Sequence, residues 1–171
     1  MSNDVHLESN RLIVRDWRAD EVDGMHRWYG DPTVRKFLPF GADSREESEK
    51  HLKETVIPSQ GQSPRIEYYL AVELKETGQT IGDVGFGWKG PKLAEIGYFL
   101  EPAYWGAGYA TEAARLITRY AFELGADAVI AACGENNSAS ENVMHRCGMQ
   151  PQPSDEPGRL LYRVERDQFS K

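Results

Sequence analysis

Residues 103–114 read AYWGAGYATEAA, and the two glycines in this stretch, Gly106 and Gly108, stand directly before a run with helical spacing. Glycine weakens the start of a helix, so its use here needs a reason. One interpretation is a phosphate cradle, because the first N–H groups of a helix are unpaired and partly positive, and glycine lets an anion approach them. The other is a tight turn between a strand and a helix, where glycine is common. The glycines alone leave both interpretations open.

The segments on either side of this stretch predict a parallel crossover. Upstream, residues 92–100 (KLAEIGYFL) alternate in the manner of a strand. Downstream, apolar residues recur at helical spacing from Tyr109 to Leu124, and Gly125 ends the run. Residues 127–133 (DAVIAAC) are short, apolar and bounded by turn residues, as is typical of a buried strand. A strand, a loop, a helix and a strand in this order connect two parallel strands of one sheet.

The remaining strands are expected to be antiparallel. Their apolar and β-branched side chains predict strands at residues 11–17, 67–74, 81–88 and 159–166, with a hairpin turn at 76–80. The fold class is therefore α+β, with a mixed, mostly antiparallel sheet of about six to seven strands flanked by helices. We expect residues 1–171 to form a single domain.

Three further helices are expected from their start and stop signals. The first begins at Val22 and is closed by Pro32. The second begins after Ser44, whose spacing to Glu47 is that of a capping box. The third carries the same spacing at Ser138 and Glu141, and a glycine at position 148 stops it.

Composition narrows the classes of partner. The chain has 171 residues, a net charge of −7 and no basic block, so we expect no nucleic-acid partner. No apolar run approaches the length of a membrane span, and no signal peptide is recognisable, so we expect a cytoplasmic protein with no membrane partner. The four histidines show no metal-binding spacing, which predicts no metal site. Cys133 and Cys147 are expected to be free thiols, with Cys147 a packed core residue rather than a nucleophile.

The residues around Gly108 exclude one phosphate-binding motif, the P-loop, and match a second, the dinucleotide-binding motif, only poorly. A P-loop needs Lys and then Ser or Thr after its last glycine, whereas Tyr109 and Ala110 follow here. A dinucleotide-binding fold needs GxGxxG directly after a strand. Here Thr111 stands at the third glycine position, and the EPAYW segment separates the strand from Gly106.

Residues 94–113 (AEIGYFLEPAYWGAGYATEA), followed after one strand by residues 136–149 (NNSASENVMHRCGM), resemble the GCN5-related N-acetyltransferases. Within that family the chain is similar to the branch that includes the ribosomal-protein N-terminal acetyltransferases. The family's cofactor loop has the form Gln/Arg-x-x-Gly-x-Gly/Ala, and Gly108 and Ala110 occupy its last two marked positions, with Trp105 at the first. The second signature, Asn-x-x-Ser with a helix that ends at glycine and an apolar residue, falls on Asn137, Ser140, Gly148 and Met149.

The resemblance implies how acetyl-CoA would be bound. Its pyrophosphate would lie against the backbone of Gly106, Ala107, Gly108, Tyr109, Ala110 and Thr111, next to Trp105. Its pantetheine arm would pair like an extra strand with the backbone of Tyr98, Phe99 and Leu100, where the strand parts from its neighbour. Asn137 would fix the pantetheine amides.

The resemblance also implies an acetyl transfer to a primary amine by direct attack, which needs a base for the amine and an acid for the thiolate. Glu95 is the candidate base, and a solvent-facing strand residue is the alternative. Ser140 is the candidate acid, and an ordinary first-turn residue of a helix is the alternative. The acceptor is expected to be a protein N-terminus or a small-molecule amine, and the branch makes a homodimer a candidate assembly. The rival function is a non-catalytic acyl-CoA sensor or interaction module on the same fold.

The resemblance places the acceptor over the first two helices and the closing strands, where aromatic and apolar side chains gather. The residues available there are Trp28, Tyr29, Phe37, Leu38 and Phe40. Of these, Trp28 and Phe37 are expected to be core residues.

Overall fold

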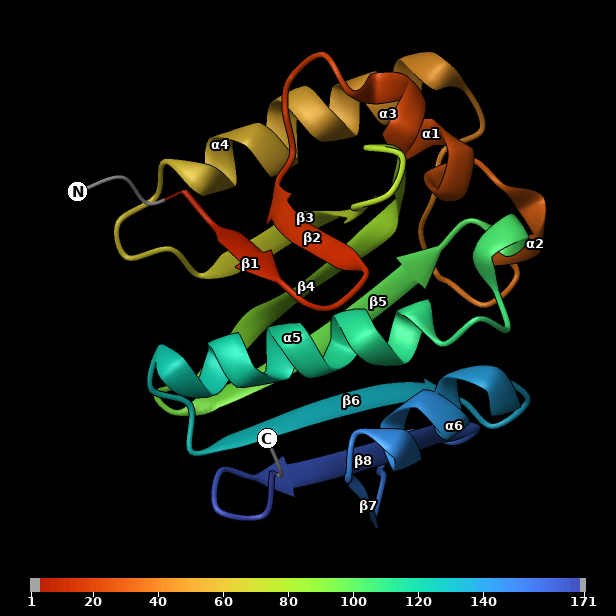
Figure 1. The fold of residues 1–171 in the computed structure, drawn as a ribbon. Helices are drawn as coiled ribbons and strands as arrows, with labels where there is room; N and C mark the ends of the chain where they lie inside the picture. Colours follow the sequence, from red (N-terminus) through yellow and green to blue (C-terminus); the bar gives the residue numbers. More distant parts are fainter. Residues whose placement is uncertain (1–3, 170–171) are drawn as a thin grey trace.

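The computed structural model describes residues 4–169, and within them one eight-stranded sheet runs through the molecule (Figure 1). The strand order across the sheet is β1-β2-β3-β4-β5-β6-β8-β7. Only the β5–β6 pair is parallel, and the other six pairings are antiparallel. The expected α+β class and mixed, mostly antiparallel sheet are confirmed.

The strands are β1 (His6–Glu8), β2 (Leu12–Asp16), β3 (Glu67–Leu74), β4 (Thr80–Gly90), β5 (Leu93–Leu100), β6 (Ala128–Gly134), β7 (Gln150–Gln152) and β8 (Arg159–Glu165). The α-helices are α1 (Val22–Tyr29), α2 (Pro32–Arg35), α3 (Arg45–His51), α4 (Ile57–Gln60), α5 (Tyr109–Glu123) and α6 (Ser138–Arg146). A π-helical turn at Leu52–Val56 joins α3 to α4, and a 3₁₀ turn at Pro102–Tyr104 follows β5.

Every strand expected from the sequence is present, and two strands of three residues each, β1 and β7, were not expected. The helix after Ser44 has the expected capping box with Glu47. Two other expected helix ends are wrong. Pro32 opens the short helix α2 instead of closing α1, because proline suits the first turn of a helix. The cap of α6 is Asn137, whose Oδ1 accepts from the N–H of Ser140, and not Ser138.

The sheet separates two layers of helices, and each layer has its own core. Alternate residues of each strand point to opposite faces. On one face, apolar residues such as Val84, Ile96 and Leu100 pack against α5 and α6. On the other face, residues such as Ala71 pack with the side chains of α1, with those of the π-helical turn at Leu52–Val56 and with Trp17. No helix among residues 4–169 is both long and apolar enough to cross a membrane.

The parallel pair β5–β6 is short, and this opens the sheet near its centre. Leu93–Glu95 pairs with Ala128–Ile130, and the pairing ends there. Beyond that point β5 continues beside β4, while β6 continues beside β8. Figure 1 shows the two arrows diverging toward α2 and α6. The sheet therefore contains a gap between two strands that are each anchored on their far side.

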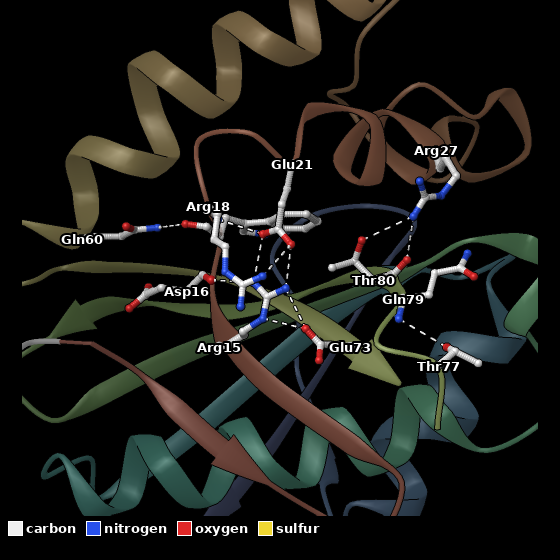
Figure 2. A network of polar contacts seen from close by, with 11 residues as sticks. Arg15, Asp16, Arg18, Glu21, Arg27, Gln60, Glu73, Thr77, Gln79 and Thr80 are labelled. Carbon is white, nitrogen blue, oxygen red and sulfur yellow. Dashed lines mark hydrogen bonds and ion pairs between the residues drawn. The ribbon is translucent and has the colours of Figure 1, made fainter. Parts of the chain in front are cut away.

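A polar cluster joins the start of α1 to the sheet (Figure 2). The guanidinium of Arg15 on β2 donates to Glu21 at 2.6 and 2.9 Å, and to Glu73 on β3 at 2.8 Å. The side chain of Arg15 is only 9% exposed. Because a buried cation is stable only with close partners, this cluster fixes the segment before α1 on the sheet.

We predict that Arg15→Ala lowers the free energy of unfolding by about 3 kcal/mol, because it leaves two partly buried carboxylates, Glu21 and Glu73, without their cation. Arg18→Ala is the matched control. Arg18 also faces Glu21, at 3.8 Å, but its side chain is 65% exposed, so we expect a change within about 0.5 kcal/mol. Urea unfolding measures both. Equal effects of the two substitutions would contradict the role given to Arg15.

Candidate active site

A cavity of about 760 Å³ lies where β5 and β6 part. It reaches both faces of the sheet, since its lining includes residues from the segment after α2 as well as from α5 and α6. The structure brings nearly all of the site residues expected from the sequence to this cavity. They are Glu95, Tyr98, Phe99, Leu100, Trp105, Gly106, Gly108, Tyr109, Ala110, Thr111, Asn137 and Ser140. Ala107 is not part of the lining.

The glycines of the loop adopt backbone conformations that other residues rarely reach. Gly106 has φ +79° and Gly108 has φ +82°, and Gly108 is the N-cap of α5. Among residues 4–169, the backbone N–H groups of residues 106–111 have no hydrogen-bond acceptor. The hydroxyl of Thr111 is also buried without a partner there. The loop thus presents a row of unused donors at the positive end of a fifteen-residue helix.

Arg11, next to the start of β2, holds this loop in place and was not expected from the sequence. Its guanidinium donates to the carbonyl oxygen of Ala107 at 2.9 Å and to Glu112 on α5 at 2.7 Å. It also lies over the ring of Tyr109, 4.2 Å from the centroid. Ser9 completes the cluster with a 2.6 Å hydrogen bond to Glu112. Ala107 therefore helps to fix the loop, because its carbonyl oxygen accepts the hydrogen bond from Arg11.

The edge of β5 presents backbone groups to the gap. The N–H of Glu101 donates to Ile81 on β4 at 2.9 Å. Because backbone groups alternate along a strand, those of Phe99 also point toward β4, while those of Tyr98 and Leu100 point toward the gap. The carbonyl of Leu100 already accepts from the indole N–H of Trp105 at 2.9 Å. Tyr98 is thus the residue whose backbone is placed to pair with an extended ligand.

Ser140 lies across the gap from Tyr98, in the first turn of α6. The hydroxyl of Tyr98 is 2.9 Å from the Ser140 Oγ and 2.9 Å from its carbonyl oxygen. Burial raises the pKa of Tyr98, so this hydroxyl keeps its proton. Asn137 uses its Oδ1 to cap the helix, which leaves the side-chain NH₂ for other contacts. The two hydroxyls form a pair of proton donors on the α6 side of the gap.

Glu95 lies on the opposite face of the sheet, and its carboxylate is already paired. Lys89 approaches it at 3.3 Å and Arg159 at 3.1 Å. The two residues expected to act as base and acid, Glu95 and Ser140, therefore face the cavity from opposite sides of the sheet. The gap between β5 and β6 is the passage that joins those sides.

Two further acidic residues line the cavity and were missed in the sequence. Asp83 on β4 is buried, and Trp17 donates its indole N–H to the Asp83 carboxyl at 2.6 Å. Burial raises the pKa of Asp83 from 3.8 to about 8. Glu67 on β3 lies at the same face, and burial raises its pKa as well. A sequence signal for this face existed in the glycines inside the strands at positions 85, 87 and 97, since glycine in a strand often marks a close approach.

The remaining candidates fall into simpler roles. Cys147 is buried, and burial raises its pKa to about 11, which suits a packed thiol. Trp28 is a core residue, as expected, and stacks on Phe99 at 5.3 Å. The expectation for Phe37 is wrong: its side chain is 37% exposed and lines the cavity, because the segment after α2 passes over the sheet opening. Among residues 4–169, no group of three or more His, Cys, Asp or Glu side chains is arranged to hold a metal ion.

Known proteins are similar to this chain in sequence and in fold. The family model described as "Acetyltransferase (GNAT) domain" matches residues 11–150. The uncharacterized N-acetyltransferase YnaD of Bacillus subtilis (strain 168) is 28% identical over 148 residues, which cover 85% of this chain and 83% of that protein. The FsC-acetyl coenzyme A-N(2)-transacetylase of Aspergillus fumigatus is 38% identical over 87 residues, covering 44% of this chain and 37% of that protein.

Solved structures extend the likeness to the whole fold. An acetyltransferase of the GNAT family from Bacillus anthracis superposes with a TM-score of 0.83 at 23% identity, covering 95% of this chain and 99% of that one. RimL, a ribosomal L7/L12 alpha-N-protein acetyltransferase solved in complex with coenzyme A, superposes with a TM-score of 0.80 at 18% identity, covering 94% and 98%. The chain therefore belongs to the GNAT family of acetyl-CoA-dependent N-acetyltransferases.

We predict that Asp83→Asn stabilises the fold increasingly as the pH rises. The buried carboxyl holds its proton up to about pH 8, whereas the unfolded chain loses it near pH 4. Between these values the unfolded state binds fewer protons, so the wild-type stability falls with rising pH. The substituted side chain keeps an acceptor for Trp17 and has no proton to lose. Its advantage should grow by up to about 1.4 kcal/mol per pH unit.

Urea unfolding at pH 5, 6, 7 and 8 measures this advantage, with the exposed Asp155→Asn as the control. A difference between Asp83→Asn and the wild type that does not change with pH would contradict a protonated Asp83.

Proposed function

We propose that this chain moves an acetyl group from acetyl-CoA to a primary amine by direct attack of the amine on the bound thioester. One observation carries the proposal: the gap between β5 and β6 joins a loop of unused backbone donors to a mostly apolar cavity on the far face of the sheet, whose lining includes Glu67, Asp83 and Glu95. The donor and the acceptor can then enter from opposite faces and meet at the gap. The acceptor is a small-molecule amine or a protein N-terminus.

The loop residues suit the pyrophosphate of acetyl-CoA. Residues 106–111 offer successive N–H groups at a helix N-terminus, and glycine at 106 and 108 keeps side chains out of the way. Nothing lies within 4 Å of the position that a Cβ on Gly106 would take, so the space beside it is open. The buried, unpartnered hydroxyl of Thr111 adds a donor that a phosphate oxygen would satisfy.

The strand edge suits the pantetheine arm. The N–H and C=O of Tyr98 face the gap, where they can pair with an amide-rich ligand. The N–H of Tyr98 is also the donor best placed to polarise a thioester carbonyl. Bound acetyl-CoA supplies an activated acyl group, and the protein supplies the orientation and the proton transfers.

Ser140 is proposed as the acid that protonates the departing thiolate. Its hydroxyl lines the cavity and shares a hydrogen bond with the hydroxyl of Tyr98, which keeps its proton. Glu95, the base expected from the sequence, faces the acceptor side, where Lys89 and Arg159 hold its carboxylate. Glu95 thereby fixes two cations at the rim of the acceptor cavity.

We predict that Gly106→Ala weakens acetyl-CoA binding about tenfold, equivalent to about 1.4 kcal/mol. The added methyl group enters the open space beside the loop and strains a backbone with φ +79°. Gly78→Ala is the matched control, because Gly78 has φ +69° and equally open surroundings but lies in the β3–β4 turn. Both variants should lose similar stability, and only Gly106→Ala should lose affinity.

Calorimetry and ligand-induced thermal shifts with acetyl-CoA and CoA measure this. If the wild type bound neither ligand, the proposal that residues 106–111 bind the pyrophosphate would be wrong. Equal loss of affinity in both variants would show that backbone strain alone is responsible.

We further predict that Ser140→Ala lowers kcat by about 10- to 100-fold with little change in the Kd for acetyl-CoA, because a proton donor is lost and the backbone contacts remain. Ser154→Ala, in an exposed loop, is the control. Stopped-flow detection of released thiol measures kcat. An unchanged kcat would remove Ser140 from the proton path and leave Tyr98 as the candidate acid.

A further inference from the structure

The acceptor side of the cavity has a floor of glycine and walls of apolar side chains. Gly85 on β4 pairs with Gly97 on β5, so the sheet is bare at this point. The segment after α2 forms the wall above it, with Phe37, Leu38, Pro39 and Phe40 in the lining. The aromatic side chains of Tyr69 and Phe99 line the same side. This shape suits a ligand with an apolar body.

Among the acidic side chains of residues 4–169 that line the cavity, one carries a negative charge that is available to a ligand. Asp83 is neutral at pH 7, because burial raises its pKa to about 8. Glu95 is paired with Lys89 and Arg159. Glu67, by contrast, has a carboxylate that makes no hydrogen bond and no ion pair among residues 4–169. A carboxylate left free in a mostly apolar cavity favours binding a cation there.

Because residue 87 is glycine, the Glu67 carboxylate can pack directly against the sheet backbone at that position. A Cβ at this position would stand 2.5 Å from Oε2 and 2.7 Å from Oε1 of Glu67. Glu67, Gly87, Glu95 and Ile130 form one row across four strands. Glu95 and Ile130 are the last β5–β6 pair before the gap. The Glu67 carboxylate therefore lies over Gly87, on the row of residues that leads across β5 to the gap between β5 and β6.

We propose that Glu67 receives the ammonium group of the acceptor and takes its proton, and that the acceptor is a small molecule, a primary amine on an apolar body with no second positive charge. This proposal rests on the acetyl transfer proposed above. Glu95 is less suited to the task, because its oxygens already face two cations that would have to move.

The Glu67 carboxylate accepts one proton from R–NH₃⁺, and the freed nitrogen lone pair forms the new C–N bond to the thioester carbonyl carbon. The C–S bond breaks with its electron pair on sulfur. The thiolate takes a proton from the Ser140 hydroxyl. The nitrogen, now bonded to the acyl carbon, loses its second proton, and this proton returns to the Ser140 oxygen. Glu67 then releases its proton to water, so the products are R–NH–CO–CH₃, CoA–SH and H⁺.

The charged and titratable groups around Glu67 support this role. Burial raises the pKa of Glu67, and the charge of Glu95 acts in the same direction, while Lys89 opposes both. Tyr69 and the neutral Asp83 complete the face, and Arg159 is held by Glu95. A base with a raised pKa accepts a proton more readily near neutral pH. A second ammonium group would lie against the apolar wall without a partner, which disfavours polyamines.

The test uses defined probe amines with the intact protein and acetyl-CoA: 2-phenylethylamine, n-hexylamine, spermidine, and a short peptide with a free N-terminal amine next to apolar residues. Thiol release gives kcat/KM for each. We expect the two monoamines to exceed spermidine at least tenfold. A preference for spermidine would overturn the single-charge class. A preference for the peptide over both monoamines would overturn the small apolar body and point to a protein N-terminus.

Two variants test Glu67 itself. Glu67→Gln should lower kcat/KM for 2-phenylethylamine about 100-fold and remove the acidic limb of the pH profile. Gly87→Ala should lower it at least tenfold while keeping the carboxylate, because the methyl group displaces the flexible end of Glu67 from the sheet. Glu76→Gln, in the exposed turn between β3 and β4, should leave it unchanged. A kcat/KM for Glu67→Gln within threefold of the wild type, or a loss no larger than that of Glu95→Gln, would overturn the role of Glu67.

Binding measurements separate this inference from the transfer on which it rests. Calorimetry with 2-phenylethylamine in the presence of CoA, with the neutral 2-phenylethanol as control, should show amine binding that Glu67→Gln loses. Thermal shifts with acetyl-CoA should be the same in wild type, Glu67→Gln and Gly87→Ala. No shift in the wild type would refute the acetyl transfer. If acetyl-CoA raised the Tm of the wild type but neither monoamine bound or was acetylated, the proposed acceptor class would be wrong and acetyl-CoA binding would stand.

Discussion

The parallel pairing of β5 with β6 ends after Glu95 and Ile130, and each strand is held beyond that point by an antiparallel neighbour on its outer side. Two strands anchored in this way cannot close on one another, so the sheet keeps a gap near its centre. Unpaired backbone groups are costly unless something satisfies them. Trp105 satisfies the carbonyl of Leu100, and the groups of Tyr98 are left for a ligand. The cavity, the passage between the faces and the exposed backbone all follow from this one interruption.

Side chains from distant parts of the chain hold the edges of this gap. Arg11 links β2 to the glycine loop and to α5 through Ala107 and Glu112. Asn137 fixes the first turn of α6, which places Ser140 opposite Tyr98. These contacts are pre-formed, so less ordering accompanies ligand binding. The loop itself can then use glycine, with its high conformational entropy, without losing its shape.

The three acidic residues at the acceptor face differ because their surroundings differ. Asp83 is fully buried and keeps its proton, Glu95 is neutralised by two cations, and Glu67 is partly buried and forms no ion pair among residues 4–169. Three carboxyl groups therefore have three different roles. Asp83 accepts the hydrogen bond of Trp17, Glu95 holds Lys89 and Arg159 at the rim of the cavity, and Glu67 remains a free anion. Gly87 makes the third of these arrangements possible by leaving room above the sheet.

The sequence by itself determined the order and type of the longer strands and helices, because periodicity and the signals at Ser44, Gly108 and Gly125 are local properties. It did not indicate the short elements β1, β7, α2 and α4. It also indicated the family, through the loop at 103–114 and the segment at 136–149. It could not show that Glu67 lies beside Gly87, that Arg11 holds Ala107, or that Glu95 is already paired with Arg159, 64 residues further along the chain. Those contacts join strands and loops far apart in the chain, so only tertiary packing decided which carboxylate is free to meet an acceptor.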